Sequence, residues 1–178
     1  MVLLRGVNVG KGNKVPMAEF RAVLEEFGHT EVQTLLNSGN AVFSSASRSP
    51  AKLATDIASS VQSRFGVVTP VIVKSAAELA AIVANNPIVP PESENSRFLV
   101  AFAMDRAKLQ ELSSLQSLLQ PPGERLAVTE QAAYLHCAGG LLESKAGEAI
   151  LGRGGRSITT RNWGTTLKLA SLLTGSAA

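Results

Sequence analysis

The order of strand and helix patterns in this chain of 178 residues predicts an α+β fold with two ferredoxin-like (split βαβ) subdomains. The first six expected elements follow the order β-α-β-β-α-β, and a helix comes after them. A segment rich in Pro, Asn and acidic residues then interrupts the pattern at 86–96. Beyond it the order begins again, so a duplicated β-α-β-β-α-β-α unit is expected. The expected subdomains are therefore 1–85 and 97–178, with 86–96 as the linker between them.

The first half begins with an apolar strand over 1–7, and the Gly, Asn and Lys residues after it predict a loop. A helix is expected next, because Pro16 suits a first helical position and Gly28 suits the residue that ends a helix. Between them, apolar residues recur at helical spacing and predict one buried face: Met17, Phe20, Leu24 and Phe27.

Two β-rich runs, 31–36 and 40–45, are joined through Asn37-Ser38-Gly39 and predict a hairpin. Ser49-Pro50 opens a second helix, a strand is expected over 69–74, and a third helix follows. The apolar face of the second helix is formed by Leu53, Ile57, Val61 and Phe65.

The second half repeats this order. An apolar strand is expected over 97–104, and a helix begins at Asp105 and ends before Pro121. The remaining expected elements are strands over 126–129 and 133–137, a helix over 144–151, a short strand over 156–160 and a closing helix over 163–173.

The composition is that of a folded protein, with 45% hydrophobic and 17% charged residues. Aromatic residues make up only 4%, so few rings are expected to stack on single-stranded nucleic acid, and Phe43 is one of the few candidates. The single cysteine, Cys137, allows no internal disulfide and is typical of a reducing compartment. No apolar run approaches the roughly 20 residues that cross a bilayer, and the opening strand does not resemble a signal peptide. A cytoplasmic protein is expected.

Chemistry-bearing residues concentrate first in the loop that follows the opening strand. This loop places Asn8, Lys11 and Lys14 among glycines, just before the first helix. Glycine N–H groups and the positive end of a helix dipole favour an anion at such a position. The glycine spacing matches neither the Walker nor the dinucleotide-binding pattern. Two interpretations stay open: a loop that wraps an anion, or a solvated loop whose Asn and Gly residues satisfy turn geometry.

The second concentration is the string Thr159-Thr160-Arg161-Asn162-Trp163. Asn162 suits the N-cap of the closing helix, and Arg161 offers a bidentate fork for phosphate or carboxylate. Trp163 is either a stacking platform or a core anchor. Residues 141–178 hold five Lys or Arg against two Asp or Glu, which favours an anionic partner or serves only solubility.

Metal and cofactor chemistry have little support in the sequence. His29, His136 and Cys137 form no ligand spacing, so no metal and no cofactor are expected. His136 and Cys137 are neighbours in an expected strand, so their side chains point to opposite faces and cannot form a catalytic pair. No residue stands out as a general base.

Several unusual strings occur together in a fixed order: Leu4-Arg5-Gly6-Val7-Asn8-Val9-Gly10, Asn13-Lys14-Val15-Pro16-Met17, Asn37-Ser38-Gly39-Asn40-Ala41-Val42-Phe43 and Thr159-Thr160-Arg161-Asn162-Trp163. In this the chain resembles a bacterial family known as domain of unknown function 1697, over essentially its whole length. The resemblance implies an α+β fold with two ferredoxin-like subdomains and no established activity. The family's loop often has Gly-Gly-Lys-Asn where this chain has Gly10-Lys11-Gly12-Asn13, so Lys14 rather than Lys11 is expected to match the family's lysine.

The leading functional hypothesis is binding of a phosphorylated ligand, a nucleotide or a nucleic acid, at one site formed by the 8–14 loop and the 159–163 segment. One alternative is an enzyme that acts on a phosphorylated small molecule, with cationic residues stabilising charge and Asn8 or Asn40 orienting the substrate. The other is a protein-interaction module that uses its sheet edges and binds no ligand. The expected ligand-binding residues are Arg5, Asn8, Lys14, Asn37, Ser38, Asn40, Lys145, Thr160, Arg161 and Asn162.

Overall fold

A computed structural model of the protein describes residues 1–10, 12–152 and 157–175. These residues form two compact units, and each contains a four-stranded antiparallel sheet. The first unit comprises Met1–Ala76 together with the residues from Ser171 onward, and the second comprises Ala77–Ala170. The mixed α and β fold with two similar subdomains is therefore confirmed.

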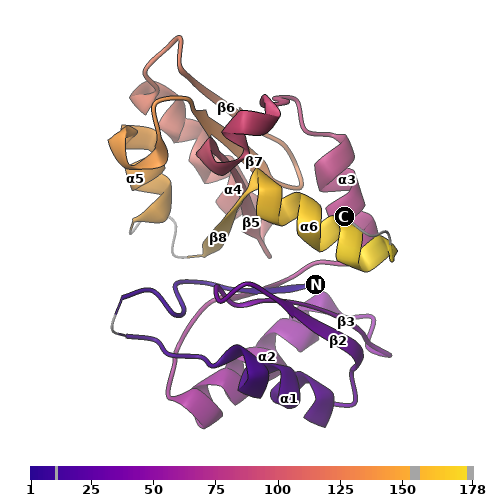
Figure 1. Ribbon diagram of the computed structural model, residues 1–178. Coiled ribbons are helices and arrows are strands. Elements are labelled where there is room, and N and C mark those ends of the chain that lie inside the picture. The colour runs from indigo at the N-terminus through magenta and orange to yellow at the C-terminus, as the bar shows by residue number, and fades with distance from the viewer. Residues whose placement is uncertain (11, 153–156, 176–178) are drawn as a thin grey trace. The chain divides into compact units, whose positions relative to one another are not determined.

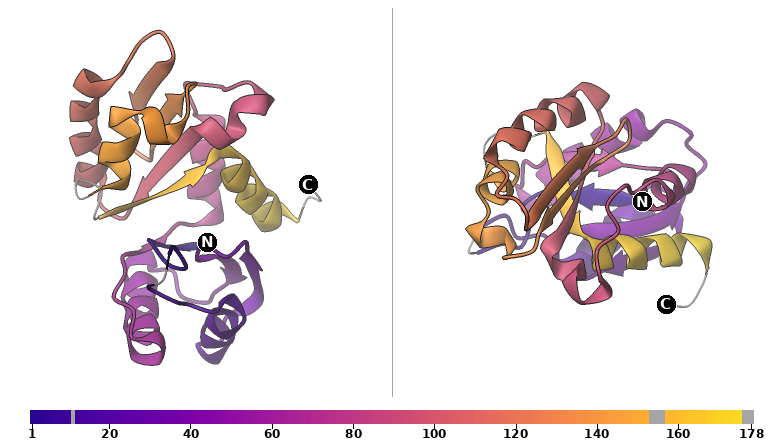
Figure 2. Two further views of the ribbon diagram at one scale, coloured as in Figure 1. Left: turned by 60° about the vertical axis from the view of Figure 1, so that its left-hand side comes forward. Right: turned by 90° about the horizontal axis from the view of Figure 1, so that it is seen from above.

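The first unit carries its two long helices on one face of its sheet, as both Figure 1 and Figure 2 show. Its elements in chain order are β1 (Val2–Leu4), α1 (Met17–Glu26), β2 (Thr30–Leu35), β3 (Asn40–Ser44), α2 (Pro50–Phe65) and β4 (Val71–Val73). The strand order across the sheet is β2-β3-β1-β4, and all neighbours are antiparallel.

The core of the first unit lies between this sheet and helices α1 and α2. Alternate strand residues point toward the helices, as the two-residue repeat of a strand requires. Phe20 and Ile57 are fully buried there. The main strand and helix contributions are Val2, Leu4, Val32, Ala41, Val71, Val73, Phe20, Leu24, Leu53, Ile57 and Val61.

Two details of the first helix differ from expectation. Pro16 has an extended ψ of 124° and precedes the helix, which begins at Met17. Phe27 was expected on the buried face, but it follows the last helical residue and is 44% exposed. Val23, one turn before Phe27, is buried instead and lines a groove with Ser60 and Arg64 of α2.

The second unit repeats the strand order of the first. Its elements are α3 (Ala76–Ala84), the 3-10 helix η1 (Glu92–Arg97), β5 (Phe98–Ala103), α4 (Arg106–Gln110), the 3-10 helix η2 (Glu111–Leu118), β6 (Glu124–Val128), β7 (Ala133–Cys137), the 3-10 helix η3 (Leu141–Glu143), α5 (Lys145–Leu151), β8 (Ile158–Asn162) and α6 (Trp163–Thr174). Ala76 at the start of α3 and the last residues of α6, from Ser171, are counted with the first unit. The order across the sheet is β6-β7-β5-β8, again antiparallel throughout. Position by position, this matches the first sheet.

Both faces of the second sheet are covered. One face packs Leu99 and Leu135 against α4, η2 and α5, and Figure 2 shows these helices on one side of the strands. On the other face, Phe98 meets the edge of the Trp163 ring, with 5.5 Å between ring centroids, and the Tyr134 hydroxyl donates to the Ile82 carbonyl of α3 at 2.7 Å. Aromatic side chains therefore anchor α3 and the start of α6.

The predicted alternation of His136 and Cys137 is confirmed. Cys137 belongs to the core that faces α5, whereas the His136 ring lies 6.0 Å from Phe98 on the opposite face. The last expected strand, 156–160, is found two residues later as β8. Residue Arg156 lies outside the described residues.

The expected helix after Asp105 is divided into α4 and the 3-10 helix η2. Asp105 caps it as predicted, because its Oδ1 accepts from the Ala107 N–H at 2.8 Å. Within the described part of the chain, none of the helices has both the length and the apolar character needed to cross a membrane.

Candidate functional site

The loop after β1 and the turn between β2 and β3 lie together at one end of the first sheet. Asn8 joins them, because its Nδ2 donates to the carbonyls of Val15 at 2.8 Å and Asn37 at 2.9 Å. Its Oδ1 accepts from the Val15 N–H at 2.9 Å, and its own N–H donates to the Asn13 carbonyl at 2.9 Å. The loop is thus closed at its base and attached to the turn. We call residues 6–10, 12–15 and 36–39 the loop cluster.

The Asn and Gly content of the loop cluster is explained by its backbone. Asn8 and Asn13 have φ values of 57° and 51°, in the left-handed region that Asn tolerates better than other non-glycine residues. Leu36 has a φ of 57° and is 58% exposed. A leucine in this conformation is strained by about 1 kcal/mol or more. Contacts of the neighbouring turn residues must therefore hold Leu36 in this conformation.

The loop cluster presents hydrogen-bond donors to solvent. Among the described residues, no protein group accepts from the backbone N–H groups of Val9, Gly10, Gly12, Asn13 or Lys14. The ammonium of Lys14 is exposed and lies 3.4 Å from the Gly10 carbonyl, at the limit of a hydrogen bond. These donors gather just before α1, whose first turn has no side-chain cap.

Other predicted residues of the first unit hold its backbone. Asn40 is fully buried, and its Nδ2 donates to the Leu35 carbonyl at 2.9 Å. The backbone N–H of Arg5 donates to Thr69 Oγ1 at 3.1 Å, next to the loop cluster. Ser38 is an exposed residue of the turn. Asn8 and Asn40, expected to orient a substrate, thus use their amides on the chain itself.

The predicted segment of the second unit is largely buried. Arg161 is 9% exposed and donates to Thr159 Oγ1 at 2.8 Å and to the Thr160 carbonyl at 2.7 Å. Burial lowers the pKa of Arg161 to about 10, so the guanidinium stays charged at neutral pH. Asn162 is the predicted N-cap of α6, because its Oδ1 accepts from the Thr165 N–H at 2.8 Å. Trp163 is 8% exposed, which supports a core anchor over a stacking platform.

The predicted residues thus fall into two groups. Arg5, Asn8, Lys14 and the turn residues 37–40 belong to the first unit, whereas Lys145 and residues 160–162 belong to the second. The structure brings the loop and the turn together. One site shared by 8–14 and 159–163 stays a prediction.

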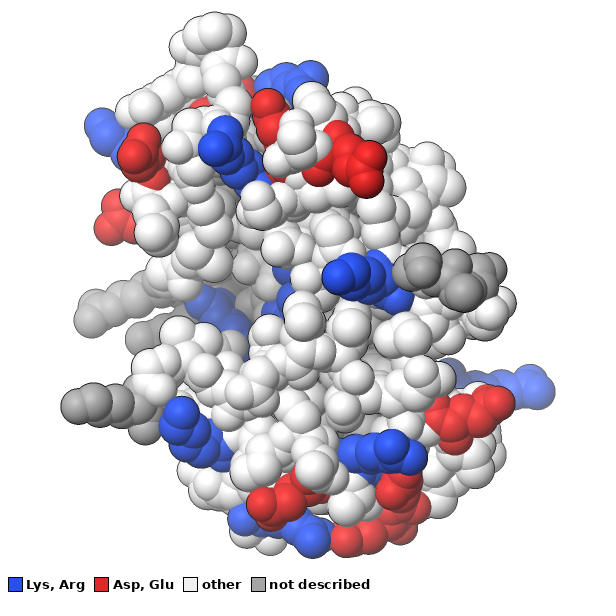
Figure 3. Space-filling model, in the orientation of Figure 1, with Lys and Arg blue, Asp and Glu red and all other residues white. Residues whose placement is uncertain are grey.

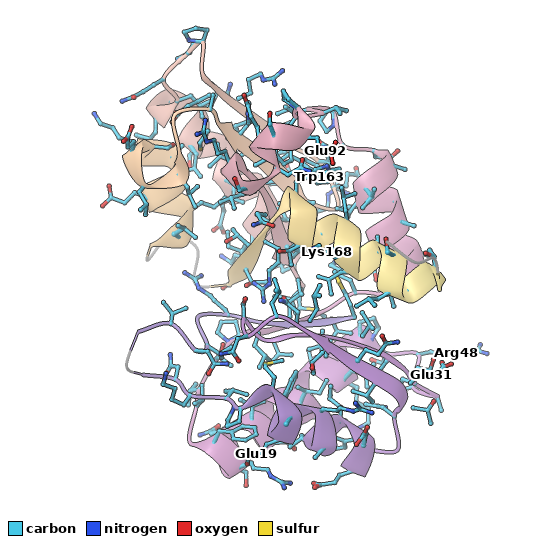
Figure 4. All side chains as sticks on the ribbon, in the orientation of Figure 1. Glu19, Glu31, Arg48, Glu92, Trp163 and Lys168 are labelled. Carbon is cyan, nitrogen blue, oxygen red and sulfur yellow. The ribbon has the colours of Figure 1, made fainter. Side chains whose placement is uncertain are left out.

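The basic closing segment forms no single patch among the described residues. Lys145 lines a groove of about 510 Å³ between η2 and α5 together with the carboxylates of Glu111 and Glu148, which disfavour an anion. Lys168 lies alone along α6 in Figure 4. On the face drawn in Figure 3, acidic and basic side chains are interspersed over each unit. Arg153 and Arg156 lie outside the described residues.

One polar cluster was not predicted from the sequence. His136 Nε2 lies 2.5 Å from Glu94 Oε2, and Arg125 Nη2 lies 3.5 Å from His136 Nδ1. A carboxylate only accepts, so His136 donates its Nε2–H to Glu94. Arg125 and His136 are register partners in β6 and β7, which the hairpin pattern indicates. Glu94 lies in the expected linker, and nothing in the sequence places it over β7.

Carboxylate and imidazole groups are otherwise dispersed. Within the ranges that the structure describes, no group of three or more His, Cys, Asp or Glu side chains is arranged to hold a metal ion. Burial raises the pKa of the Cys137 thiol, which keeps it protonated and unreactive near neutral pH.

His29 is a buried titratable group away from the loop cluster. It is 8% exposed and stacks on Phe43, with 4.4 Å between the ring centroids. The ring of Phe27 also stacks on it, with 6.2 Å between the centroids. Burial lowers the pKa of His29. Phe43 packs on the core between the sheet and its helices, so it is no platform for a base.

The His29 pKa makes stability depend on pH. The unfolded chain binds a proton at His29 near its ordinary pKa of about 6.5, whereas the folded chain resists that proton. We expect the free energy of unfolding to fall as the pH drops below about 6.5, by at most about 1.4 kcal/mol per pH unit from this group. Urea unfolding followed by far-UV circular dichroism, compared with His29→Phe at each pH, isolates the contribution. Parallel pH profiles for the two proteins would contradict it.

Comparison with known proteins gives the same family as the resemblance seen in the sequence. Residues 1–134 match the family model described as "Protein of unknown function (DUF1697)". No curated protein matches the chain. A solved structure described as conserved bacterial protein SP0830 from Streptococcus pneumoniae is similar, with a TM-score of 0.73 and 24% identity over 97% of this chain and 96% of that chain. At this identity the likeness concerns the fold. The family match spans well over half of the sequence, and the chain therefore belongs to the DUF1697 family.

Proposed function

We propose that the protein binds a phosphate-bearing ligand, of which a nucleotide or nucleic acid is the favoured class, at the loop cluster. The observation that carries this is the set of loop N–H groups for which the described residues provide no acceptor, and which lie beside Lys14 and the uncapped start of α1. Backbone N–H groups and a helix N-terminus attract phosphate oxygens without a dedicated anion motif. Asn8 closes the loop, so little ordering is needed on binding.

Charge near this loop is consistent with an anion. Lys14 is exposed and makes one long hydrogen bond, so its ammonium can move to a ligand. Glu19 is the acidic residue of the first helical turn, and it projects from the side of α1 away from the sheet in Figure 4. The loop cluster contains no histidine or carboxylate to serve as general base, which favours binding over turnover.

The ligand class is narrowed by the aromatic residues. Phe43 packs on the core and Trp163 is 8% exposed, so neither offers a free face to an unstacked base. Single-strand binding by stacking needs such faces. A small phosphate compound is therefore favoured over a polymer, whose binding would weaken steeply with added salt.

We further assign both units to the ferredoxin-like (split βαβ) class and the protein to the cytoplasm. The strand orders β2-β3-β1-β4 and β6-β7-β5-β8, with helices after the first and third strands of each unit, support the assignment of the fold. A buried, protonated Cys137 is compatible with a reducing compartment.

The test is a thermal-shift series with inorganic phosphate, nucleoside phosphates, sugar phosphates and short RNA. A ligand at about 100 times its Kd adds about 2.7 kcal/mol of stability. Lys14→Ala is expected to weaken binding about tenfold, as loss of one charge-assisted hydrogen bond implies. Arg64→Ala is the control, because Arg64 is an exposed cationic residue of the same unit that pairs with Glu26 and lies outside the loop cluster. No shift in the wild type, or equal shifts in both variants, would reject the proposal.

A further inference from the structure

A cavity of about 170 Å³ lies in the first unit, between the end of α1, the residues after β3 and the start of α2. We call it the His29 cavity. His29 precedes β2 and Ser45 follows β3, whereas the turn 36–39 joins the other ends of these strands. The His29 cavity is therefore at the opposite end of the sheet from the loop cluster. Its polar lining consists of His29, Ser45, Ser47, Lys52 and Asp56.

His29 is a buried polar ring without a hydrogen bond. Among the described residues, none bonds to either of its ring nitrogens, and Nδ1 is fully covered. A ligand in the His29 cavity can therefore reach the imidazole only at Nε2. Burial also lowers the pKa of His29, which makes the ring neutral at physiological pH. No described protein group fixes the tautomer, so Nε2 can donate to or accept from a ligand.

The serine hydroxyls of the His29 cavity still have hydrogens to donate. Ser45 Oγ accepts from the Ser47 N–H at 3.1 Å, and Ser47 Oγ accepts from the Ser49 N–H at 3.4 Å. Neither hydroxyl donates to a described protein group. These hydroxyls are therefore suited to a carbonyl oxygen.

Charge in the His29 cavity is balanced. Lys52 Nζ lies 2.7 Å from Asp56 Oδ2, so the two residues neutralise each other. The remaining walls include the partly exposed ring of Phe27 and the apolar side chains of Leu53 and Ile57. A ligand with a net charge would lack a counter-charge here, whereas an uncharged ring can contact the apolar wall and bond with the polar one.

We propose that the His29 cavity binds a compact uncharged heterocycle, a single ring that carries both a carbonyl and an N–H or amino group. The volume of the His29 cavity is sufficient for a single ring, since a dry cavity of about 150 Å³ holds one benzene molecule. The carbonyl accepts from Ser45 or Ser47, and the N–H group donates to Nε2 of the neutral imidazole. This site is independent of the phosphate site proposed for the loop cluster.

The experiment uses the full chain with imidazole side-chain NMR. Cytosine and nicotinamide are the ring probes, with benzene and inorganic phosphate as probes of the competing classes. We expect saturable shifts of the His29 ring signals with a ring probe and no shift of the His136 signals. His29→Phe, which keeps an aromatic ring on Phe43, is expected to weaken binding about tenfold, the equivalent of one lost hydrogen bond. Because this variant lacks the reporting imidazole, its binding is followed on the NMR signals of the ring probe.

A second variant keeps the test decisive if His29→Phe does not fold. The double change Ser45→Ala with Ser47→Ala is expected to weaken binding similarly, and Ser59→Ala, an exposed serine of α2 outside the lining, is the control. Lys14→Ala is expected to leave the response unchanged, which separates this proposal from the phosphate site. The proposal is overturned if no ring probe shifts His29, if benzene binds as tightly as cytosine, or if phosphate alone produces the shift.

Discussion

Replacing Phe98 with alanine is expected to lower the free energy of unfolding of the second unit by about 4 kcal/mol. Phe98 is fully buried and lies among three rings, with centroid distances of 5.5 Å to Trp163, 6.0 Å to His136 and 6.4 Å to Tyr134. Removing it leaves a cavity that these rings border and that cannot close without moving α6. Trp163 is the only tryptophan, so its fluorescence during urea unfolding measures this effect directly.

The control for this prediction keeps most of the volume. Phe98→Leu leaves an apolar side chain against Trp163 and is expected to cost about 1.5 kcal/mol. A loss below about 1 kcal/mol for both variants would mean that the second sheet does not depend on this aromatic contact. Equal losses would show that ring contact, and not volume, decides its stability.

The parts of the fold that sequence predicts well are those set by local periodicity. The hairpin of β2 and β3 follows from two β-rich runs with a Ser-Gly turn between them, and Asn162 is an N-cap because its amide oxygen can reach the third N–H of α6. Ends of helices are less certain. At Phe27 the apolar spacing continues for one residue beyond the point where the helix stops, and spacing alone cannot show that.

The candidate site was predictable where a residue type is favoured by a particular backbone conformation. Asn and Gly in the loop cluster indicated left-handed residues, and Asn8 and Asn13 have them. Arg161 was expected to offer its guanidinium to phosphate or carboxylate, yet it is 9% exposed, because β8 lies beside the central strand β5 of a sheet covered on both faces. The contact of Glu94 with His136 joins residues far apart in sequence, and no local pattern encodes such a contact.

Replacing Gly39 with alanine is expected to destabilise the first unit by about 3 kcal/mol and to disturb the proposed phosphate site. Gly39 has a φ of 75°, where an L side chain is strained by about 1–2 kcal/mol. A Cβ at this position would lie 2.6 Å from Leu4 Cβ and 2.7 Å from Val7 Cγ2, and such overpacking adds about 1–3 kcal/mol. Urea unfolding followed by far-UV circular dichroism measures the loss.

Gly28→Ala separates the two causes of this effect. Gly28 has nearly the same backbone, with a φ of 77°, but a Cβ there meets no atom within 4 Å. Gly28→Ala is therefore expected to lower the free energy of unfolding only by the cost of the strained backbone, about 1 kcal/mol. The Gly39 carbonyl also accepts from the Leu4 N–H at 2.8 Å. A side chain that pushes the turn away from β1 would therefore also move Asn37, to whose carbonyl Asn8 donates. If Gly39→Ala proves no more harmful than Gly28→Ala, the turn is not wedged against β1, and the loop cluster lacks the rigid support that its proposed role requires.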